Sequence, residues 1–238
     1  MKKQEGFLSG LVKKPLKTAA WSGILIFAAF LIYQIVSYIV SMAAPGSSSL
    51  NFLLSVYTIA SLIITSLFTY GFYILGIKYN RGFLKICSLL LIIFFIVSSI
   101  LSIFFLNPLI MGLVADLESL TSSTAESQGI DTATMTNEQS ETLNTALLGA
   151  IQANPEMIKQ TFILLGYLGV LLLIFLVLTV LFYSGMIGLG KQVRYAKLAG
   201  IFGIVGLFTA IIFVGLFLLI AAYIFKIIIL FSESKKFE

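Results

Sequence analysis

The sequence predicts an all-α integral membrane protein, a five-helix transmembrane bundle with a small helical extracytoplasmic loop. Apolar residues make up 59% of the 238 residues, and charged residues only 11%. A soluble chain carries roughly 25% charged residues to cover its surface. Five long stretches are apolar throughout and do not alternate with polar residues, which favours spanning helices over the strands of a membrane barrel.

A helix needs about 20 apolar residues to cross the hydrocarbon core of a bilayer. Three spans are expected in residues 19–106 and two in residues 157–231. Their approximate ranges are 19–43, 50–77, 83–106, 157–189 and 198–225. The first exceeds the roughly 7–15 apolar residues of a secretory signal, so we expect an uncleaved anchor. Asn154-Pro155 is expected to begin the fourth helix, with Asn as its cap.

Positive charge predicts the orientation of the spans, because cytoplasmic segments are enriched in Lys and Arg. Residues 1–18 and the links after the second and fourth spans hold most of the 15 basic residues. The residues expected to set this topology are Lys13, Lys14, Lys17, Lys78, Arg81, Lys85, Lys191, Arg194 and Lys197. Five spans in the cell membrane then leave the amino terminus cytoplasmic and the tail, residues 232–238, extracytoplasmic.

Residues 107–156 form the one long polar segment, which contains acidic residues but no Lys or Arg. Asn107-Pro108 and the pair Thr136 and Gln139 are typical of helix starts, so two amphipathic helices should flank a polar centre. These helices either lie on the outer leaflet or form a cap that binds another membrane protein or an extracytoplasmic partner. The spacing of the carboxylates does not match a calcium-binding loop.

The residue types that are absent exclude several kinds of chemistry. The chain has no His, and its single Cys, Cys87, has no second Cys with which to form a disulfide or a metal cluster. No predicted span has an acidic residue in its interior, where an intramembrane catalyst would need one. Gly185–Lys191 matches the start of a phosphate-binding loop, but Gln192 stands where Ser or Thr would hold magnesium. We therefore expect no enzyme, no catalytic residues, no cofactor, no metal and no nucleic-acid partner.

Small and polar residues within the spans are candidates for helix packing. Gln34 lies near the middle of the first span, where its amide should bond across a helix interface. The residues Ala199, Gly203, Gly206 and Ala210 share one face of the fifth span, because their spacing follows the turns of a helix. Small residues on one face allow two helices to approach closely.

The fifth span is also expected to be unusually long. No turn signal interrupts Leu198–Phe231, and at about 1.5 Å per residue such a helix measures roughly 50 Å against a bilayer core of about 30 Å. It should therefore project beyond the outer leaflet. Lys226 is then expected at the outer interface, and Ile227–Phe231 against the helices of the polar segment.

An offset of 112 residues aligns the second and third spans with the fourth and fifth. Leu75-Gly76 then aligns with Ile187-Gly188, and Phe83–Ser88 with Tyr195–Gly200. The two helical hairpins are therefore a candidate parallel repeat.

Around these residues the chain resembles a family of uncharacterised archaeal multi-pass membrane proteins that share a domain of unknown function. The likeness rests on Gly76–Tyr79, Leu84–Ser88 and Gly215–Lys226, and it covers residues 60–106 and 160–231. The resemblance implies a multi-pass membrane protein and no particular activity.

Two functions fit these observations. The first is a non-enzymatic scaffold or accessory subunit of a membrane complex, with a partner bound to residues 107–156. The alternative is a small carrier or channel for an uncharged or lipophilic solute, which a polar crevice reaching Gln34 would favour. The alternative is indicated by polar side chains of the second span, namely Tyr57, Thr58, Ser61, Thr65, Thr69 and Tyr70.

Overall fold

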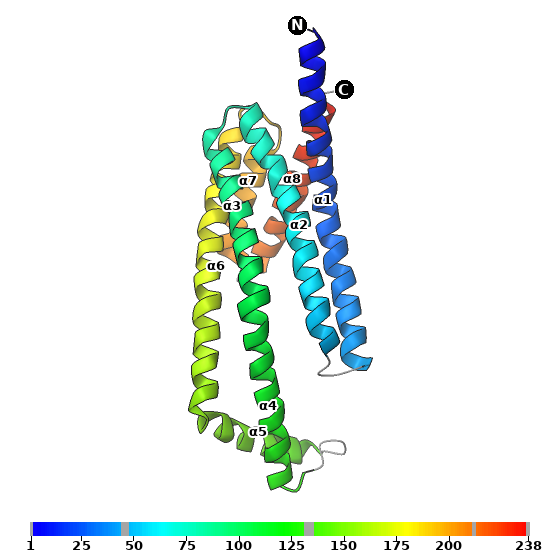
Figure 1. Ribbon diagram of the computed structural model, residues 1–238. Coiled ribbons are helices and arrows are strands. Elements are labelled where there is room, and N and C mark those ends of the chain that lie inside the picture. Colours follow the sequence, from blue (N-terminus) through cyan, green and yellow to red (C-terminus); the bar gives the residue numbers. More distant parts are fainter. Residues whose placement is uncertain (1, 44–47, 131–135, 211–212, 237–238) are drawn as a thin grey trace. The chain divides into compact units, whose positions relative to one another are not determined.

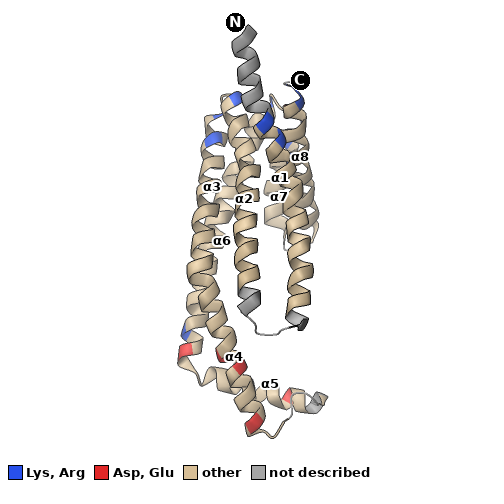
Figure 2. Ribbon diagram, turned by 45° about the vertical axis from the view of Figure 1, so that its right-hand side comes forward, with Lys and Arg blue, Asp and Glu red and all other residues tan. Residues whose placement is uncertain are grey.

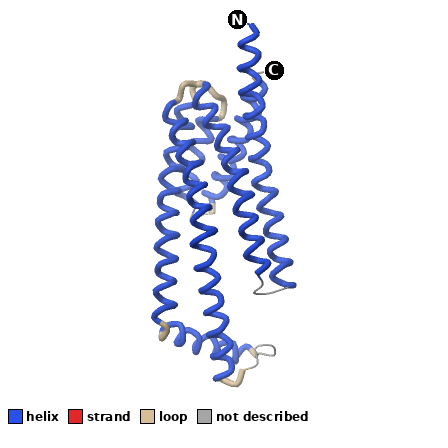
Figure 3. Tube along the Cα trace, viewed as in Figure 1, coloured by secondary structure: helices blue, strands red, loops and turns tan. Residues whose placement is uncertain are grey.

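The computed structural model describes residues 2–43, 48–130, 136–210 and 213–236, and all the regular elements in these ranges are helices (Figures 1 and 3). Five of the helices are long and apolar enough to cross a membrane. The predicted all-α membrane protein is therefore confirmed. The chain forms two compact units, named here the bundle unit (Met1–Ser99 with Leu173–Glu238) and the loop unit (Ile100–Leu172).

Six helices contribute to the bundle unit. They are α1 (Lys2–Ala43), α2 (Ser48–Lys78), α3 (Gly82–Leu101, up to Ser99), α6 (Pro155–Leu189, from Leu173), α7 (Ala196–Thr209) and α8 (Val214–Lys235). Helix α1 packs against α2 and α8, and α7 packs against α8. Turns join α2 to α3 and α6 to α7, and each contains a non-glycine residue with positive φ, Asn80 at 51° and Tyr195 at 68°.

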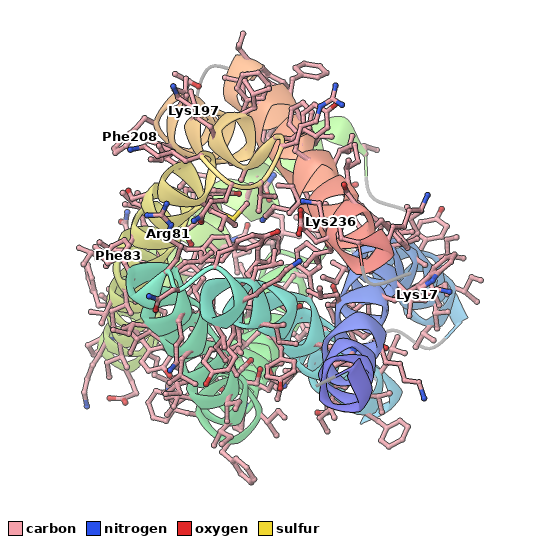
Figure 4. All side chains as sticks on the ribbon, turned by 90° about the horizontal axis from the view of Figure 1, so that it is seen from above. Lys17, Arg81, Phe83, Lys197, Phe208 and Lys236 are labelled. Carbon is pink, nitrogen blue, oxygen red and sulfur yellow. The ribbon has the colours of Figure 1, made fainter. Side chains whose placement is uncertain are left out.

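Basic residues gather at one end of the bundle unit, named here the basic end (blue ribbon segments in Figure 2). It comprises the α2–α3 turn, the α6–α7 turn and the neighbouring parts of α1 and α8. Its described basic residues are Lys14, Lys17, Lys78, Arg81, Lys85, Lys191, Arg194, Lys197, Lys235 and Lys236. Figure 4 looks down on the molecule from this end; the exposed Phe83 lies at the start of α3 at this end, whereas the exposed Phe208 lies in the last turn of α7, away from it. The side chain of Lys13, also predicted to set the topology, lies outside the described residues.

The fifth predicted span is not one helix. The prediction of a continuous helix over Leu198–Phe231 is wrong, because α7 ends at Thr209 and α8 begins at Val214. The two helices run back along each other, so the Tyr195 ring near the start of α7 stacks on the Phe225 ring in the second half of α8, with centroids 5.6 Å apart. The crossing is very close, since a Cβ atom on Gly215 would lie 2.2 Å from the Ala210 nitrogen.

This reversal returns α8 to the basic end. The Glu233 carboxylate accepts hydrogen bonds from Lys78, at 2.9 Å, and from the Tyr79 hydroxyl. The tail therefore starts at the basic end, and not at the opposite end as five unbroken spans would require. Helix α7 has 14 residues, about 21 Å, which is too short to cross a core of about 30 Å.

The last turns of α8 pack within the bundle unit, which corrects the predicted packing of Ile227–Phe231 on the polar segment. Trp21 of α1 meets Phe231 edge to face, with ring centroids 5.7 Å apart. Leu230 is fully buried, and its side chain lies 2.8 Å from the Cβ position of Gly71 on α2. Because Gly71 has no side chain, α8 can pack closely against α2 at this point.

The loop unit contains the two helices predicted for the polar segment. Its elements include η1 (Ser102–Leu106), α4 (Asn107–Ser127) and α5 (Asn137–Gln152). The predicted capping box of α5 is confirmed, because the Thr136 hydroxyl accepts from the Gln139 N–H at 3.3 Å and the Gln139 side chain accepts from the Thr136 N–H at 2.9 Å. The predicted cap of α6 is also confirmed, with Asn154 Oδ1 accepting from the Met157 N–H at 3.2 Å.

Helix α4 begins at Asn107 with Pro108 in its first turn, as predicted, but Asn107 does not cap a free helix end. Helix α3 continues through the π-helical turn η1 into α4, so the apolar helix runs from Gly82 to Ser127. In this turn the Asn107 N–H bonds to the Ser102 carbonyl. Pro108 has no N–H to donate, and the wider π turn before it lets the helix continue through the proline.

Candidate ligand-binding cavity

A cavity of about 310 Å³ lies inside the bundle unit. Its wall consists of aromatic rings and aliphatic side chains with three threonines and one lysine, contributed by α1, α2, α3, α6 and α8. The lining residues are Ile26, Thr65, Phe68, Thr69, Phe72, Leu91, Phe95, Phe175, Thr179, Phe182, Tyr183, Tyr223 and Lys226. Its volume is at the lower end of the range typical of small-molecule sites.

Lys226 is the one basic residue in this lining, and its ammonium lies among aromatic rings. The Nζ atom is 5.6 Å from the ring centroid of Phe68, 5.8 Å from that of Phe182, 5.1 Å from that of Tyr183 and 5.0 Å from that of Tyr223. It also donates a hydrogen bond to the Tyr183 hydroxyl at 3.3 Å. Ring faces attract a cation at these distances. The sequence placed this ammonium at the outer interface, whereas the structure places it inside the bundle unit.

No carboxylate pairs with Lys226 in the described part of the chain. The next acidic residue along α8 is Glu233, about two turns nearer the basic end. Its two oxygens already accept hydrogen bonds from Lys78, Tyr79 and Lys236. Ionisable side chains inside membrane helices are costly, and they commonly mark functional sites. Lys226 is therefore the strongest candidate for a ligand-binding residue.

A second polar group in the cavity lacks a partner. Thr179 Oγ1 is buried and makes no hydrogen bond within the described residues. Thr179 and Tyr183 are four residues apart on α6, so both side chains lie on the same helix face. By contrast, the Thr69 hydroxyl donates to the Thr65 carbonyl at 2.9 Å. Because most buried polar atoms in proteins are hydrogen-bonded, the Thr179 hydroxyl is available to a ligand or to water.

The residues predicted for helix packing lie in different surroundings. Gln34 is exposed on α1 and does not line the cavity, and its amide makes no hydrogen bond to another helix among the described residues. Ala199, Gly203 and Gly206 are buried, and Ala210 is half-buried. A Cβ atom on Gly203 would lie 2.3 Å from the Tyr183 ring, and one on Gly206 3.0 Å from the Gly215 carbonyl oxygen. The small-residue face thus meets α6 and α8.

The polar side chains of the second span do not form a continuous crevice. Thr65 and Thr69 line the cavity. Thr58 and Ser61 instead bond to carbonyl groups of their own helix. Tyr57 stacks on Tyr33 with centroids 4.1 Å apart, and Tyr70 stacks on Tyr73. Sequence reasoning identified two lining residues of this helix but missed Lys226, because the side of α8 that faces the bundle depends on the reversal before it.

The loop unit has an apolar groove of about 300 Å³ on its own residues. The groove is formed by α4, the end of α5 and the first turns of α6. Its lining residues are Ile110, Leu113, Val114, Leu117, Ile151, Met157, Thr161 and Leu164. Across both units, the described residues contain no group of three or more His, Cys, Asp or Glu side chains that could hold a metal.

Compared with protein-family models, curated proteins and solved structures, the chain has no significant match. The resemblance to the archaeal family thus stays a prediction.

Proposed function

We propose that this protein is a non-enzymatic carrier or binding protein that holds a lipophilic solute inside the bundle unit. The observation that carries the proposal is the cavity, in which a lysine and an unpartnered threonine hydroxyl lie among aromatic rings. Ligand sites are typically apolar cavities with a small number of polar groups that orient the ligand.

The surroundings of the cavity support a solute that enters from the lipid phase. Between the cavity and the basic end, Leu75, Met186 and Leu189 are fully buried and close the bundle unit. On the other side of the cavity, Ile63 of α2 and Ile96 of α3 are exposed. Such apolar surface is stable only in lipid or against another apolar surface. An apolar solute in the bilayer therefore has a shorter route to the cavity than a solute that arrives from the basic end.

We further propose that the basic end faces the cytoplasm of the cell membrane, since cytoplasmic segments are enriched in Lys and Arg. The Lys78–Glu233 ion pair at this end then makes both termini cytoplasmic. This assignment replaces the extracytoplasmic carboxyl terminus expected from five spans.

Binding to the protein in lipid nanodiscs tests the function. Pyrene-labelled decanoic acid and pyrene-labelled decanol are titrated, and the signal of empty nanodiscs is subtracted. We expect saturable binding of at least one probe by the wild type and at least tenfold weaker binding by Thr179→Trp, which fills the cavity. Ile35→Trp adds the same ring to an exposed position of α1 and should bind like the wild type. Absence of saturable binding, or equal binding by both variants, would reject the function.

A second candidate function is an accessory subunit of a membrane complex, favoured by the exposed apolar groove of the loop unit. A photocrosslinking amino acid at Val114, in the groove, should then capture one defined membrane protein in native membranes. The same group at Ser123, exposed on the same helix, should not. Equal labelling from both positions, or labelling of lipid alone, would argue against this candidate.

A further inference from the structure

We infer that the solute is a lipophilic monoanion, a single-chain or aromatic carboxylate whose headgroup binds Lys226. The inference rests on the proposed function, in which the cavity binds a solute, and it adds the chemical class of that solute. Three features of the cavity carry it: its charge, the direction of its hydrogen bonds, and its size.

The charge of the cavity is positive. The Lys226 ammonium has three N–H groups, and within the described residues its one hydrogen bond is to the Tyr183 hydroxyl. The aromatic rings stabilise the cation but do not neutralise it. A carboxylate that enters the cavity would form charge-assisted hydrogen bonds, which are roughly twice as strong as neutral ones. The cavity therefore favours an anion over a neutral molecule of the same shape.

The free polar groups of the cavity can all donate a hydrogen bond. Tyr183 accepts from Lys226, so its own O–H proton is available to a further acceptor. The Thr179 hydroxyl, one turn away on α6, makes no hydrogen bond. The Tyr223 hydroxyl, in contrast, is already bonded to the Gly23 carbonyl at 2.8 Å. An ionised carboxylate only accepts hydrogen bonds, so it matches the donors of Lys226, Tyr183 and Thr179.

The size of the cavity and its single positive charge further restrict the chemical class of the solute. A volume of about 310 Å³ with a mainly aromatic wall suits one acyl chain or a ring system, and not a lipid with two chains. A single lysine neutralises a monoanion, whereas a phosphate monoester carries about 1.5 to 2 negative charges at neutral pH. Phosphate groups are usually held by several basic or backbone donors. A carboxylate is therefore the better match.

The test compares three ligands with the same chain and different headgroups: dodecanoate, dodecanol and dodecyl phosphate. Their affinities for the full chain in zwitterionic nanodiscs are measured by competition with a pyrene-labelled probe that binds saturably. We expect the wild type to bind dodecanoate about tenfold or more tightly than dodecanol, the factor that about 1.4 kcal/mol represents. Dodecyl phosphate should bind less tightly than dodecanoate.

Variants assign the preference to the cavity. Lys226→Met should abolish the preference, so that dodecanoate binds no more tightly than dodecanol. Thr179→Val, which keeps the shape of the side chain, should weaken dodecanoate binding severalfold. Lys191→Met removes an exposed positive charge at the basic end and should change neither affinity. It controls for the net charge of the protein, and a single size-exclusion peak in detergent shows that each variant is folded.

The outcomes separate the inference from the function. If the wild type binds dodecanol as tightly as dodecanoate, the headgroup inference is wrong while the function stands. Tighter binding of dodecyl phosphate than of dodecanoate would overturn the carboxylate assignment. Loss of dodecanoate binding in Lys191→Met as well as in Lys226→Met would attribute the effect to overall charge. If none of the three ligands competes and the probe itself does not bind, the function fails together with the inference.

Discussion

Glu233 is almost completely buried at the basic end, with 1% of its side chain exposed. A buried carboxylate is stable only when it is paired and hydrogen-bonded. Lys78, Tyr79 and Lys236 provide these partners. The contact joins the end of α8 to the end of α2 and adds to the packing of Leu230 and Phe231 at this position.

Glu233→Gln should therefore lower the apparent melting temperature of the purified protein. Hydrogen bonds to charged groups contribute about 1.5–3 kcal/mol, which corresponds to roughly 5 °C for a chain of this size. Thermal unfolding followed by size-exclusion chromatography measures the change. Glu156→Gln is the matched control, because Glu156 and its partner Lys159 are both largely exposed and 3.6 Å apart. Equal melting of the two variants would contradict a structural role for Glu233.

Gly203 influences the shape of the cavity indirectly, because it packs against Tyr183, which lines the cavity. A Cβ atom on Gly203 would lie 2.3–2.4 Å from three atoms of the buried Tyr183 ring. Gly203→Ala should therefore displace this ring, lower stability by about 1–3 kcal/mol through overpacking, and weaken ligand binding in the nanodisc assay. Gly188→Ala is the control, since nothing lies within 4 Å of a Cβ atom there and Ala favours a helix over Gly. If both variants melt and bind alike, Gly203 does not position Tyr183.

At the scale of the elements, the reversal between α7 and α8 determines which residues face the cavity. No proline marks it, and the run of apolar residues continues across it. Two features of the sequence point to it in retrospect. The run is too long for one crossing, and it contains Gly215, where only a glycine fits against the Ala210 nitrogen.

A crosslink tests this hairpin. In a chain with Cys87 replaced by Ala, cysteines at positions 195 and 225 should be joined by a short bifunctional thiol reagent, because the Tyr195 and Phe225 rings stack in the structure. In a continuous helix these positions would be about 45 Å apart, beyond the reach of such a reagent. Cysteines at 195 and 217 should not react with each other, since residue 217 lies in the first turn of α8. Crosslinking of this second pair instead of the first would contradict the hairpin.

The two turns at the basic end share a local feature that bears on the candidate repeat. A Cβ atom on Gly76 would lie 2.8 Å from the Lys85 nitrogen, and one on Gly190 would lie 2.9 Å from the Lys197 nitrogen. In both turns a glycine at the end of one helix thus allows the first turn of the following helix to pack closely against it. The offset that aligns Lys85 with Lys197 pairs Gly76 with Gly188 and not with Gly190. The likeness is therefore one of turn geometry, and α7 is shorter than α3.

For the whole molecule, the position of α8 predicts that the two termini lie on the same side of the membrane. A green fluorescent protein fused after Glu238 should fluoresce, and an alkaline phosphatase fused there should be inactive, as expected in the cytoplasm. Phosphatase inserted after Ile130, in the polar segment, should be active if that segment is extracytoplasmic. An active phosphatase at the carboxyl terminus would contradict the cytoplasmic placement and support a continuous fifth span that ends on the extracytoplasmic side.

The sequence by itself determined the class of the protein and most helix positions. Each apolar stretch has to be long enough to cross a bilayer, and this requirement acts on every stretch separately. The caps at Thr136 and Asn154 were predictable for the same reason, since a cap and its partners lie within one turn. The continuation of the helix through Pro108 was missed, because the π turn before it satisfies the backbone without a sequence pattern of its own.

The tertiary structure alone decided the end of the bundle unit at which the chain finishes and the groups that line the cavity. The Lys78–Glu233 bond joins residues separated by 155 positions. The surroundings of Lys226 likewise combine rings from α2, α6 and α8. Such contacts depend on how helices pack, and packing depends on the shapes of several side chains at once. A periodic pattern within one helix does not contain this information, so the positive charge in the cavity lining became apparent only in the folded chain.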